Sequence, residues 1–266
     1  DLGPERIRVF ASYIQAVDPY GHPITVHSAH DPLKALAFTF GDERFSLTSI
    51  QLNKRRIDTL VEDFRKATAA AGRPLPISMD EFVLDVGQKE SWKPFDRAEM
   101  HRKQKLWPTY FSGGQIEFIL EDLLWVESFK KPRLEVLWKQ VGIARGFMEE
   151  HLPFWEMEPA DELVEGEATL KVGHGGGRSF GLGAQVFLKA GEVYAVYFPV
   201  ASETGMLDLV DAEGVFQARW FNPRSGLFEG EVREIRGGKL TSCGEPPNSL
   251  REDWVLLLRK QNPGSS

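Results

Sequence analysis

Residues 75–81 read Leu-Pro-Ile-Ser-Met-Asp-Glu, a short apolar run that ends on two carboxylates, Asp80 and Glu81. A short run of this kind, bounded by turn residues, is typical of a buried strand. Helical periodicity appears on both sides of it, over residues 57–68 and 96–111. A strand placed between two amphipathic helices predicts a parallel sheet with helices outside it.

The same alternation continues in both directions along the chain. Further helices are expected at residues 4–17 and 132–150, and further strands at residues 23–27, 45–52 and 115–119. The predicted order is α-β-β-α-β-α-β-α. This order favours either a barrel or a doubly wound sheet.

After residue 158 the sequence changes to short β-rich segments punctuated by glycine. The candidate strands cover residues 179–188, 193–199, 206–210, 216–221, 231–236 and 253–259. Turns such as Ala190-Gly191 separate them. We therefore predict two domains, 1–158 with an α/β fold and 159–261 as an antiparallel β-sandwich, followed by a disordered tail at 262–266.

Composition narrows the classes of partner. The chain of 266 residues has 32 Lys and Arg against 39 Asp and Glu, a net charge of −7, and no basic block, which argues against a nucleic-acid partner. No stretch approaches the roughly 20 apolar residues of a membrane span, so no membrane partner is expected. Residues 1–20 lack a signal-peptide pattern. Cys243 is the one cysteine, which leaves no internal disulfide and little support for structural zinc.

Four motifs occur in an order that resembles one group of enzymes. They are residues 18–27 (Asp-Pro-Tyr-Gly-His-Pro-Ile-Thr-Val-His), the Asp80-Glu81 pair, residues 112–118 (Ser-Gly-Gly-Gln-Ile-Glu-Phe) and residues 152–157 (Leu-Pro-Phe-Trp-Glu-Met). The pattern resembles bacterial apiosidase-like proteins and endoglucanases of the glycoside hydrolase type. In that group a (β/α)8 barrel is followed by a β-sandwich named for collagen binding, and residues 215–226 and 253–258 resemble the sandwich.

This resemblance implies a fold class and a partner. The fold would be the C-terminal half of a TIM-like (β/α)8 barrel followed by a small antiparallel β-sandwich. The family's acid/base carboxylate sits on an earlier strand, so we expect it to come from an N-terminal half-barrel on the same or another chain. The resemblance further implies a carbohydrate substrate, no cofactor, and an extracellular or periplasmic location.

Hydrolysis of a glycosidic bond requires two carboxyl groups that flank the scissile oxygen. Barrel enzymes place such groups at the C-terminal ends of their strands, and Glu81 fits that position. By resemblance Glu81 is the nucleophile and Asp80 a supporting neighbour that helps bind substrate. The alternative is that the pair caps the following loop.

Three further residues are candidates for binding sugar: His27 and Gln51 at or near strand ends, and Glu117 within the strand that follows Glu81. His27 could hydrogen-bond a sugar hydroxyl or orient a carboxylate, and Gln51 could bind sugar in the same way. Glu117 follows a glycine pair that would allow close approach of a ring. The alternative for Glu117 is an ion pair with an arginine inside the barrel.

Tryptophans invite a sugar-stacking interpretation, since indole rings offer flat apolar faces. The chain has seven: Trp92, Trp107, Trp125, Trp138, Trp155, Trp220 and Trp254. Trp92 is the best stacking candidate because it follows the Glu81 strand in a polar loop. Most of the others, including Trp138 and Trp254, are expected in the core.

Two other patterns are weaker. His22, His27 and His30 could be read as metal ligands, but their spacing has no zincin-like helical partner, and no metal is expected. Residues 174–181 imitate both an esterase oxyanion loop and a nucleophile elbow around Ser179. The elbow requires a strand before the serine and a helix after it, which the β-rich context does not offer.

Two function classes therefore remain open. The first is a glycoside hydrolase that acts on a poly- or oligosaccharide through two carboxylates. The alternative is a non-catalytic carbohydrate-binding or scaffold protein. A second carboxylate opposite Glu81 would separate the two.

Overall fold

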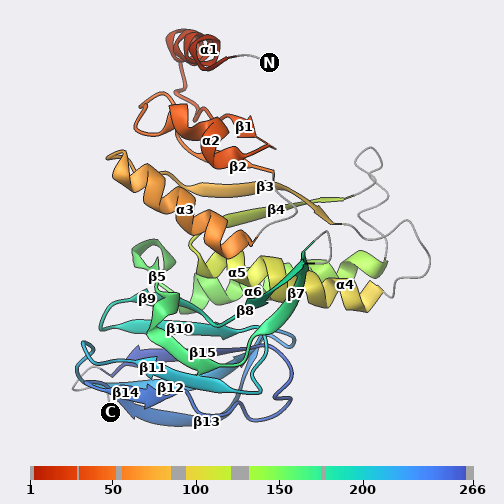
Figure 1. Ribbon diagram of the computed structural model, residues 1–266, viewed down its shortest axis with the longest axis vertical. Coiled ribbons are helices and arrows are strands. Elements are labelled where there is room, and N and C mark those ends of the chain that lie inside the picture. The colour runs from red at the N-terminus through yellow and green to blue at the C-terminus, as the bar shows by residue number, and fades with distance from the viewer. Residues whose placement is uncertain are drawn as a thin grey trace. The chain divides into compact units, whose positions relative to one another are not determined.

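The computed structural model describes residues 3–28, 30–51, 56–84, 94–120, 132–174 and 178–261 (Figure 1). It is a mixed α/β protein with several sheets. Contacts divide the chain into two compact units. Unit 1 comprises Asp1–Asp85 and Gly114–Glu121, and unit 2 comprises Val86–Gly113 and Asp122–Ser266. Each unit is described on its own.

Unit 1 contains a four-stranded parallel sheet in the order β1-β2-β3-β4. The strands are β1 (His27–Ser28), β2 (Thr48–Ile50), β3 (Ile77–Leu84) and β4 (Gln115–Leu120). The helices are α1 (Pro4–Val17), α2 (Pro32–Leu36), the short η1 (Ala37–Thr39) and α3 (Ile57–Ala70). The predictions of α1, α3, β4 and a parallel sheet are confirmed.

The first two strands are shorter than predicted. The segment 23–27 pairs as a strand only from His27, and 45–52 only over β2. Pro23 has no N–H to give to a ladder. Before His27, isolated hydrogen bonds connect this segment to residues 46–47: Ser46 N–H donates to Ile24 O, and Thr25 Oγ1 donates to Leu47 O.

Helix α3 covers one face of this sheet. Ile57, Leu60, Val61 and Phe64 recur at helical spacing and are buried. They form one core with apolar residues of the strands, among them Ile50, Ile77 and Met79. This core fixes which face of the sheet each strand residue occupies, because successive side chains of a strand point to opposite faces.

The helices of unit 2 are α4 (Pro94–His101), η2 (Arg102–Leu106), α5 (Trp107–Phe111), α6 (Pro132–His151) and the short η4 (Phe154–Glu156) and η5 (Asp161–Leu163). The helix predicted at 96–111 is divided by the π-helical turn η2, in which Trp107 N–H bonds to Arg102 O. The next residue, Pro108, lacks an N–H, so the ordinary helical bond is missing there. The prediction of α6 is confirmed.

Most strands of unit 2 belong to a six-stranded antiparallel sheet. Its order is β13 (Leu227–Arg236), β12 (Val215–Asn222), β15 (Trp254–Lys260), β10 (Val193–Phe198), β9 (Gln185–Lys189) and β5 (Glu158–Pro159). A smaller sheet has the order β14 (Leu240–Ser242), β11 (Thr204–Asp208) and β6 (Val164–Glu167). β7 (Leu170–His174) and β8 (Arg178–Leu182) form a hairpin.

The six-stranded and the three-stranded sheet of unit 2 share one hydrophobic core. Val196, Phe216 and Leu256 of the six-stranded sheet cluster with Val164 and Leu207 of the smaller one. Every residue of β10 is buried, which means that the six-stranded sheet is covered on both faces. This pattern explains why the sequence of β10 is an unbroken apolar run rather than an alternating one.

Aromatic side chains from the helices cover the other face of that sheet. The Trp107 ring stacks on Tyr197 of β10 with centroids 5.4 Å apart. Phe147 of α6 contacts Phe221 of β12 at 4.6 Å. Trp107, Phe147 and Tyr197 are at most 1 % exposed. The contacts therefore group the helices 94–111 and 132–151 with the β-rich segment. The boundary between two domains at residue 158 remains a prediction from the sequence.

A buried ion pair joins these helices to the sheet. Arg102 Nε and Nη2 donate to the two carboxylate oxygens of Asp253 at 2.8 and 2.9 Å. Asp253 is fully buried, and it also accepts from the Tyr197 hydroxyl at 3.3 Å and from Arg224. Burial, together with the Asp253 charge, raises the pKa of Tyr197 well above its ordinary value, which keeps the hydroxyl a donor.

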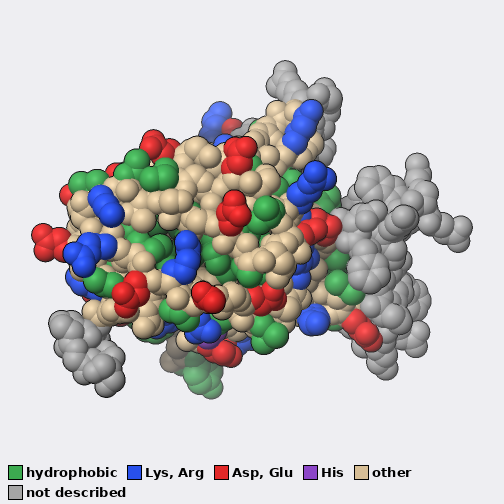
Figure 2. All heavy atoms as spheres, turned by 90° about the horizontal axis from the view of Figure 1, so that it is seen from below, with side chains coloured by type: hydrophobic (Ala, Val, Ile, Leu, Met, Phe, Trp, Pro, Cys, Tyr) green, Lys and Arg blue, Asp and Glu red, His purple; other side chains and the backbone are tan. Residues whose placement is uncertain are grey.

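Charges on the surface are mixed in sign. Figure 2 shows Lys and Arg side chains interspersed with Asp and Glu over the face in view. Within the described ranges, no helix combines the length and hydropathy that a membrane crossing requires. Residues 262–266, the predicted tail, lie outside the described residues.

We predict that Asp253→Asn destabilises the protein by about 3–5 kcal/mol, because it removes the buried counter-charge of Arg102 and leaves only the more exposed Glu252, at 3.9 Å. Urea unfolding followed by circular dichroism measures this loss. Glu149→Gln is the matched control, since it also removes half of an arginine pair, Arg145–Glu149, but on an exposed helix surface. The control should change the free energy of unfolding by no more than about 0.5 kcal/mol. Equal losses in both variants would contradict the prediction.

Cys243 should be inert toward thiol reagents in the folded protein. It is buried, and burial raises the pKa of its thiol from 9.0 to about 12. At pH 8 the folded thiol is therefore protonated, and the thiolate is the reactive form. We expect no reaction with a disulfide reagent at pH 8 until denaturant is added, followed by one equivalent. Rapid labelling of the native protein would be inconsistent with this burial.

Candidate functional site

The face of the parallel sheet opposite α3 carries polar side chains. Ile50, Ile77 and Met79 belong to the core under α3, so Ser49 and Asp80, which alternate with them, lie on the other face. Val26 likewise packs on that core, and His27 follows it. Parallel sheets normally bury apolar residues on both faces. A polar second face therefore indicates a site rather than a core.

Three side chains on this face form one cluster, the His27–Ser49–Asp80 cluster. They come from adjacent strands β1, β2 and β3, and the sheet register pairs His27 with Ser49. His27 Nδ1 lies 3.0 Å from Ser49 Oγ and 3.2 Å from Asp80 Oδ1. The Ser49 hydroxyl donates to Asp80 Oδ2. The cluster is thus a hydrogen-bonded unit that spans three adjacent strands of the sheet.

The cluster does not have the geometry of a serine nucleophile. Ser49 is 2 % exposed and gives its hydrogen to the carboxylate rather than to the imidazole. The His27 and Asp80 side chains are more accessible, at 39 and 24 %. The imidazole is therefore the most accessible group of the cluster, while the serine and the Asp80 Oδ1 atom are buried.

Next to the cluster, β3 contains an irregularity. Met79 pairs with Ile116 and Phe82 with Phe118, so Asp80 and Glu81 together oppose the single residue Glu117. Two residues opposite one define a β-bulge, a feature that is frequent beside active sites because it re-aims side chains. The bulge brings three carboxylate-bearing positions to one point of the β3–β4 ladder.

The sequence placed Asp80 and Glu81 at the end of a strand, and this placement is wrong. β3 continues through both residues to Leu84. The apolar residues Phe82, Val83 and Leu84 allow the pairing with β4 to resume after the bulge. The backbone of Glu81 is thus part of β3, whereas its side chain lies outside the described residues.

The other predicted site residues have different outcomes. Gln51 directly follows β2, is half-buried, and its N–H donates to Ser28 O at 3.0 Å. Glu117 is an exposed residue of β4. Trp92 lies outside the described residues. The structure therefore brings His27 and Asp80 together and sets Glu117 of β4 opposite Asp80 and Glu81 of β3.

Ser49 is a member of the cluster that sequence reasoning missed. In the sequence it is one of three hydroxyl residues in a β-rich run, two positions before Gln51. Such a serine is common in strands, so the sequence alone gives no reason to select it. Only the strand register, which aligns it with His27, makes it stand out.

Of the tryptophans in the described residues, three are buried, whereas Trp138, which was expected in the core, is half-buried and Trp155 is exposed. Trp107, Trp220 and Trp254 are at most 3 % exposed. Trp155 in η4 is 70 % exposed and therefore does not belong to the core. Its indole Nε1 donates to Glu156 Oε1 at 3.0 Å, which holds the ring beside a surface carboxylate.

The remaining motif candidates have structural partners. His22 Nδ1 lies 2.9 Å from Asp18 Oδ2, and the backbone N–H groups of His22 and Tyr20 lower the pKa of Asp18 by hydrogen bonding to it. Ser179 is exposed and lies in the β7–β8 hairpin, opposite Gly173. A nucleophile elbow needs a helix after the serine, so this hairpin rules out that interpretation.

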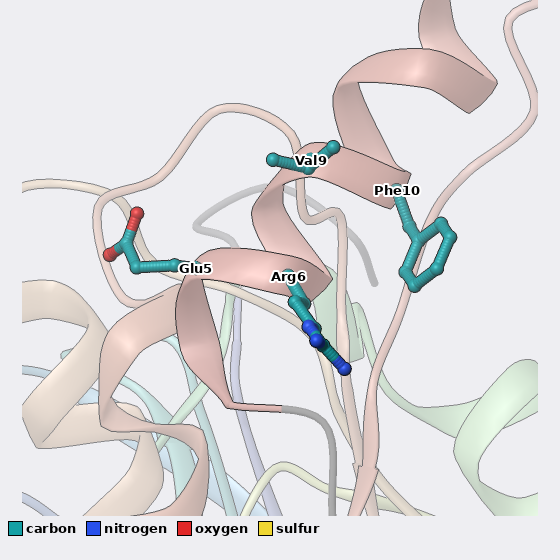
Figure 3. A pocket seen from close by; sticks show the side chains of 4 residues that line it. All are labelled: Glu5, Arg6, Val9 and Phe10. Atoms are coloured by element: carbon teal, nitrogen blue, oxygen red, sulfur yellow. The ribbon is translucent and has the colours of Figure 1, made fainter.

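A separate surface depression of about 330 Å³ lies on α1. It is lined by Glu5, Arg6, Val9 and Phe10 (Figure 3). Figure 3 shows Val9 and Phe10 projecting from the helix, and they are 68 and 53 % exposed. None of the residues of the His27–Ser49–Asp80 cluster lines it. This depression has no chemical groups beyond one carboxylate and one guanidinium.

No protein-family model matches the chain, and no curated protein is similar to it in sequence. Solved structures of similar fold do exist. One, described as a glycoside hydrolase, superposes with a TM-score of 0.68 at 15 % identity, covering 96 % of this chain and 61 % of its own. A glycoside hydrolase family 5 protein from Bacteroides vulgatus gives a TM-score of 0.64 at 18 % identity, covering 95 % of this chain and 58 % of its own.

The chain therefore spans about three fifths of the length of the solved structures it matches. At these identities the similarity shows the fold. The chain as a whole shares its fold with proteins described as glycoside hydrolases, and both the parallel sheet with its polar face and the β-rich segment fall within the matched region.

Proposed function

We propose that this protein is a glycoside hydrolase that acts on a poly- or oligosaccharide through a two-carboxylate mechanism. The observation that carries the proposal is the polar face of the parallel sheet, where the His27–Ser49–Asp80 cluster adjoins a β-bulge that contains Glu81. The shared fold with glycoside hydrolase structures supports the same assignment.

In this proposal Glu81 is the nucleophile. Its carboxylate attacks the anomeric carbon while the glycosidic bond breaks and a second carboxylic acid gives its proton to the leaving oxygen. Asp80, His27, Gln51 and Glu117 bind the sugar hydroxyls around that carbon. Polar groups of this kind fix a sugar by hydrogen bonding from several sides.

The second carboxylate belongs to further polypeptide in this proposal. Unit 1 supplies four parallel strands with α3 on one face, and a (β/α)8 barrel has eight. We assign unit 1 to the C-terminal half of such a barrel and most strands of unit 2 to a β-sandwich, as in apiosidase-like proteins. The N-terminal half-barrel, on the same or another chain, would supply the acid/base. A secreted or periplasmic enzyme fits this substrate class.

The test of the nucleophile uses the natural polypeptide that contains this sequence, with its mass and N-terminus determined first. It is assayed on a panel of polysaccharides as wild type and as Glu81→Gln. We expect the substitution to lower kcat by more than about 10²-fold, because an amide cannot form the glycosyl intermediate. Glu62→Gln, which removes half of an ion pair with Lys66 on the surface of α3, should keep full activity.

If Glu81→Gln keeps full activity while its fold is intact, the assignment of the nucleophile is wrong. If the wild type binds glycans and cleaves none of them, the alternative of a carbohydrate-binding or scaffold protein takes its place. Binding is measured by isothermal calorimetry with the same panel.

A second prediction concerns Glu117. Because we place it in substrate binding rather than in bond cleavage, Glu117→Gln should raise KM by on the order of tenfold and change kcat by less than about threefold. The measurement is steady-state kinetics on the substrate found in the panel. A large fall in kcat at unchanged KM would instead place Glu117 in the chemical step.

A further inference from the structure

Helix α1 carries an apolar stripe that stays exposed in the described part of the chain. Its residues recur at intervals of three and four, so they lie on one side of the helix. Each of them is between 42 and 68 % exposed. Isolated apolar residues are common on protein surfaces, whereas a contiguous apolar patch marks an interface. This α1 stripe consists of Val9, Phe10, Tyr13, Ile14 and Val17.

A different side of α1 attaches the helix to the rest of unit 1. Arg8 Nη2 donates to Phe38 O at 3.0 Å, and Arg44 Nη1 donates to Ser12 Oγ at 3.1 Å. Ala11, on the same side, is 2 % exposed. None of the described members of the core under α3 is a residue of the α1 stripe. The contacts that hold α1 are thus mostly polar, and its apolar stripe does not take part in them.

The place of α1 in the chain indicates which partner fits the stripe. α1 precedes β1, and among the described strands β1 pairs only with β2. In a β-α-β crossover the helix packs on the two parallel strands that it connects. A strand on the free edge of β1 would therefore lie under α1, and the helix that accompanies that strand would lie beside α1.

We propose that the α1 stripe docks the N-terminal half-barrel, through a strand beside β1 and a helix beside α1. This inference rests on the proposed function for the identity of that partner. The matched solved structures contain further polypeptide that is long enough, because this chain covers 61 and 58 % of them. A second copy of this chain could cover the stripe, but only the half-barrel supplies a parallel strand and a helix together.

The depression on α1 indicates the kind of side chain that docks there. Val9 and Phe10 project beside it, and Glu5 and Arg6 complete its lining (Figure 3). Packed helices insert the side chains of one between those of the other. A large apolar side chain of the docking helix therefore fits between Val9 and Phe10, and a polar neighbour pairs with Glu5 or Arg6.

Cysteine labelling of the natural protein, whether one polypeptide or a complex, tests this face. Val9→Cys and Val17→Cys place a thiol of similar volume at two positions of the stripe. Gln15→Cys is the matched control, because Gln15 is also exposed but lies about 160° around the helix from Val17, at 3.6 residues per turn. We expect N-ethylmaleimide to modify the stripe thiols on the order of 10²-fold more slowly than the control, since docked side chains are covered.

In denaturant all three introduced thiols should react alike, and peptide mass spectrometry assigns each label. Equal labelling of stripe and control in the native protein would overturn the inference. Equally slow labelling of all three would do the same, because the cover would not be specific to the stripe. Protection that disappears on dilution while sedimentation shows dimers of this chain would assign the stripe to a second copy instead.

The labelling needs no glycan, so its outcome is separate from that of the activity test. A protein that cleaves no glycan but protects Val9→Cys and Val17→Cys refutes the proposed function and leaves the docking face in place. A glycosidase in which both thiols react as fast as Gln15→Cys refutes the docking face and leaves the proposed function in place.

Discussion

The strict alternation of side chains along β2 and β3 is the constraint on which the site depends. Because Ile50, Ile77 and Met79 must face α3, the residues next to them in each strand must face the other way. A shift of one residue in either strand would turn the cluster into the core and expose the apolar row. The hydrophobic core under α3 thus determines the positions of Ser49 and Asp80 as firmly as their own hydrogen bonds do.

The β-bulge adds a local change to this regular pattern. Without it, Asp80 and Glu81 would point to opposite faces of β3, as neighbours in a strand do. The bulge sets both opposite Glu117 and bends the ladder there. At the bulge the strand departs from the regular alternation of side chains that the core under α3 requires. Local irregularities of this kind concentrate at functional sites.

Sequence reasoning recovered much of the fold and part of the site. Helical periodicity placed α1, α3 and α6, because amphipathic stripes are long and redundant signals. The short strands were misplaced by a few residues, since β1 has only two residues and its pairing depends on β2 rather than on its own sequence. His27 and Asp80 were selected from strand ends. Ser49 and the bulge could not be, because both follow from the register between strands that are distant in the chain.

The two compact units are not consecutive in the sequence. The chain leaves unit 1 after Asp85, returns for residues 114–121 and leaves again. Within unit 2, the stacking of Trp107 and the ion pair of Arg102 can form only after Tyr197 and Asp253 have been synthesised. Contacts across such separations close late and slow folding. A ribosome-bound chain that has emerged only to residue 158 would expose the aromatic faces of its helices, so during synthesis unit 2 cannot complete its core until β15 has emerged.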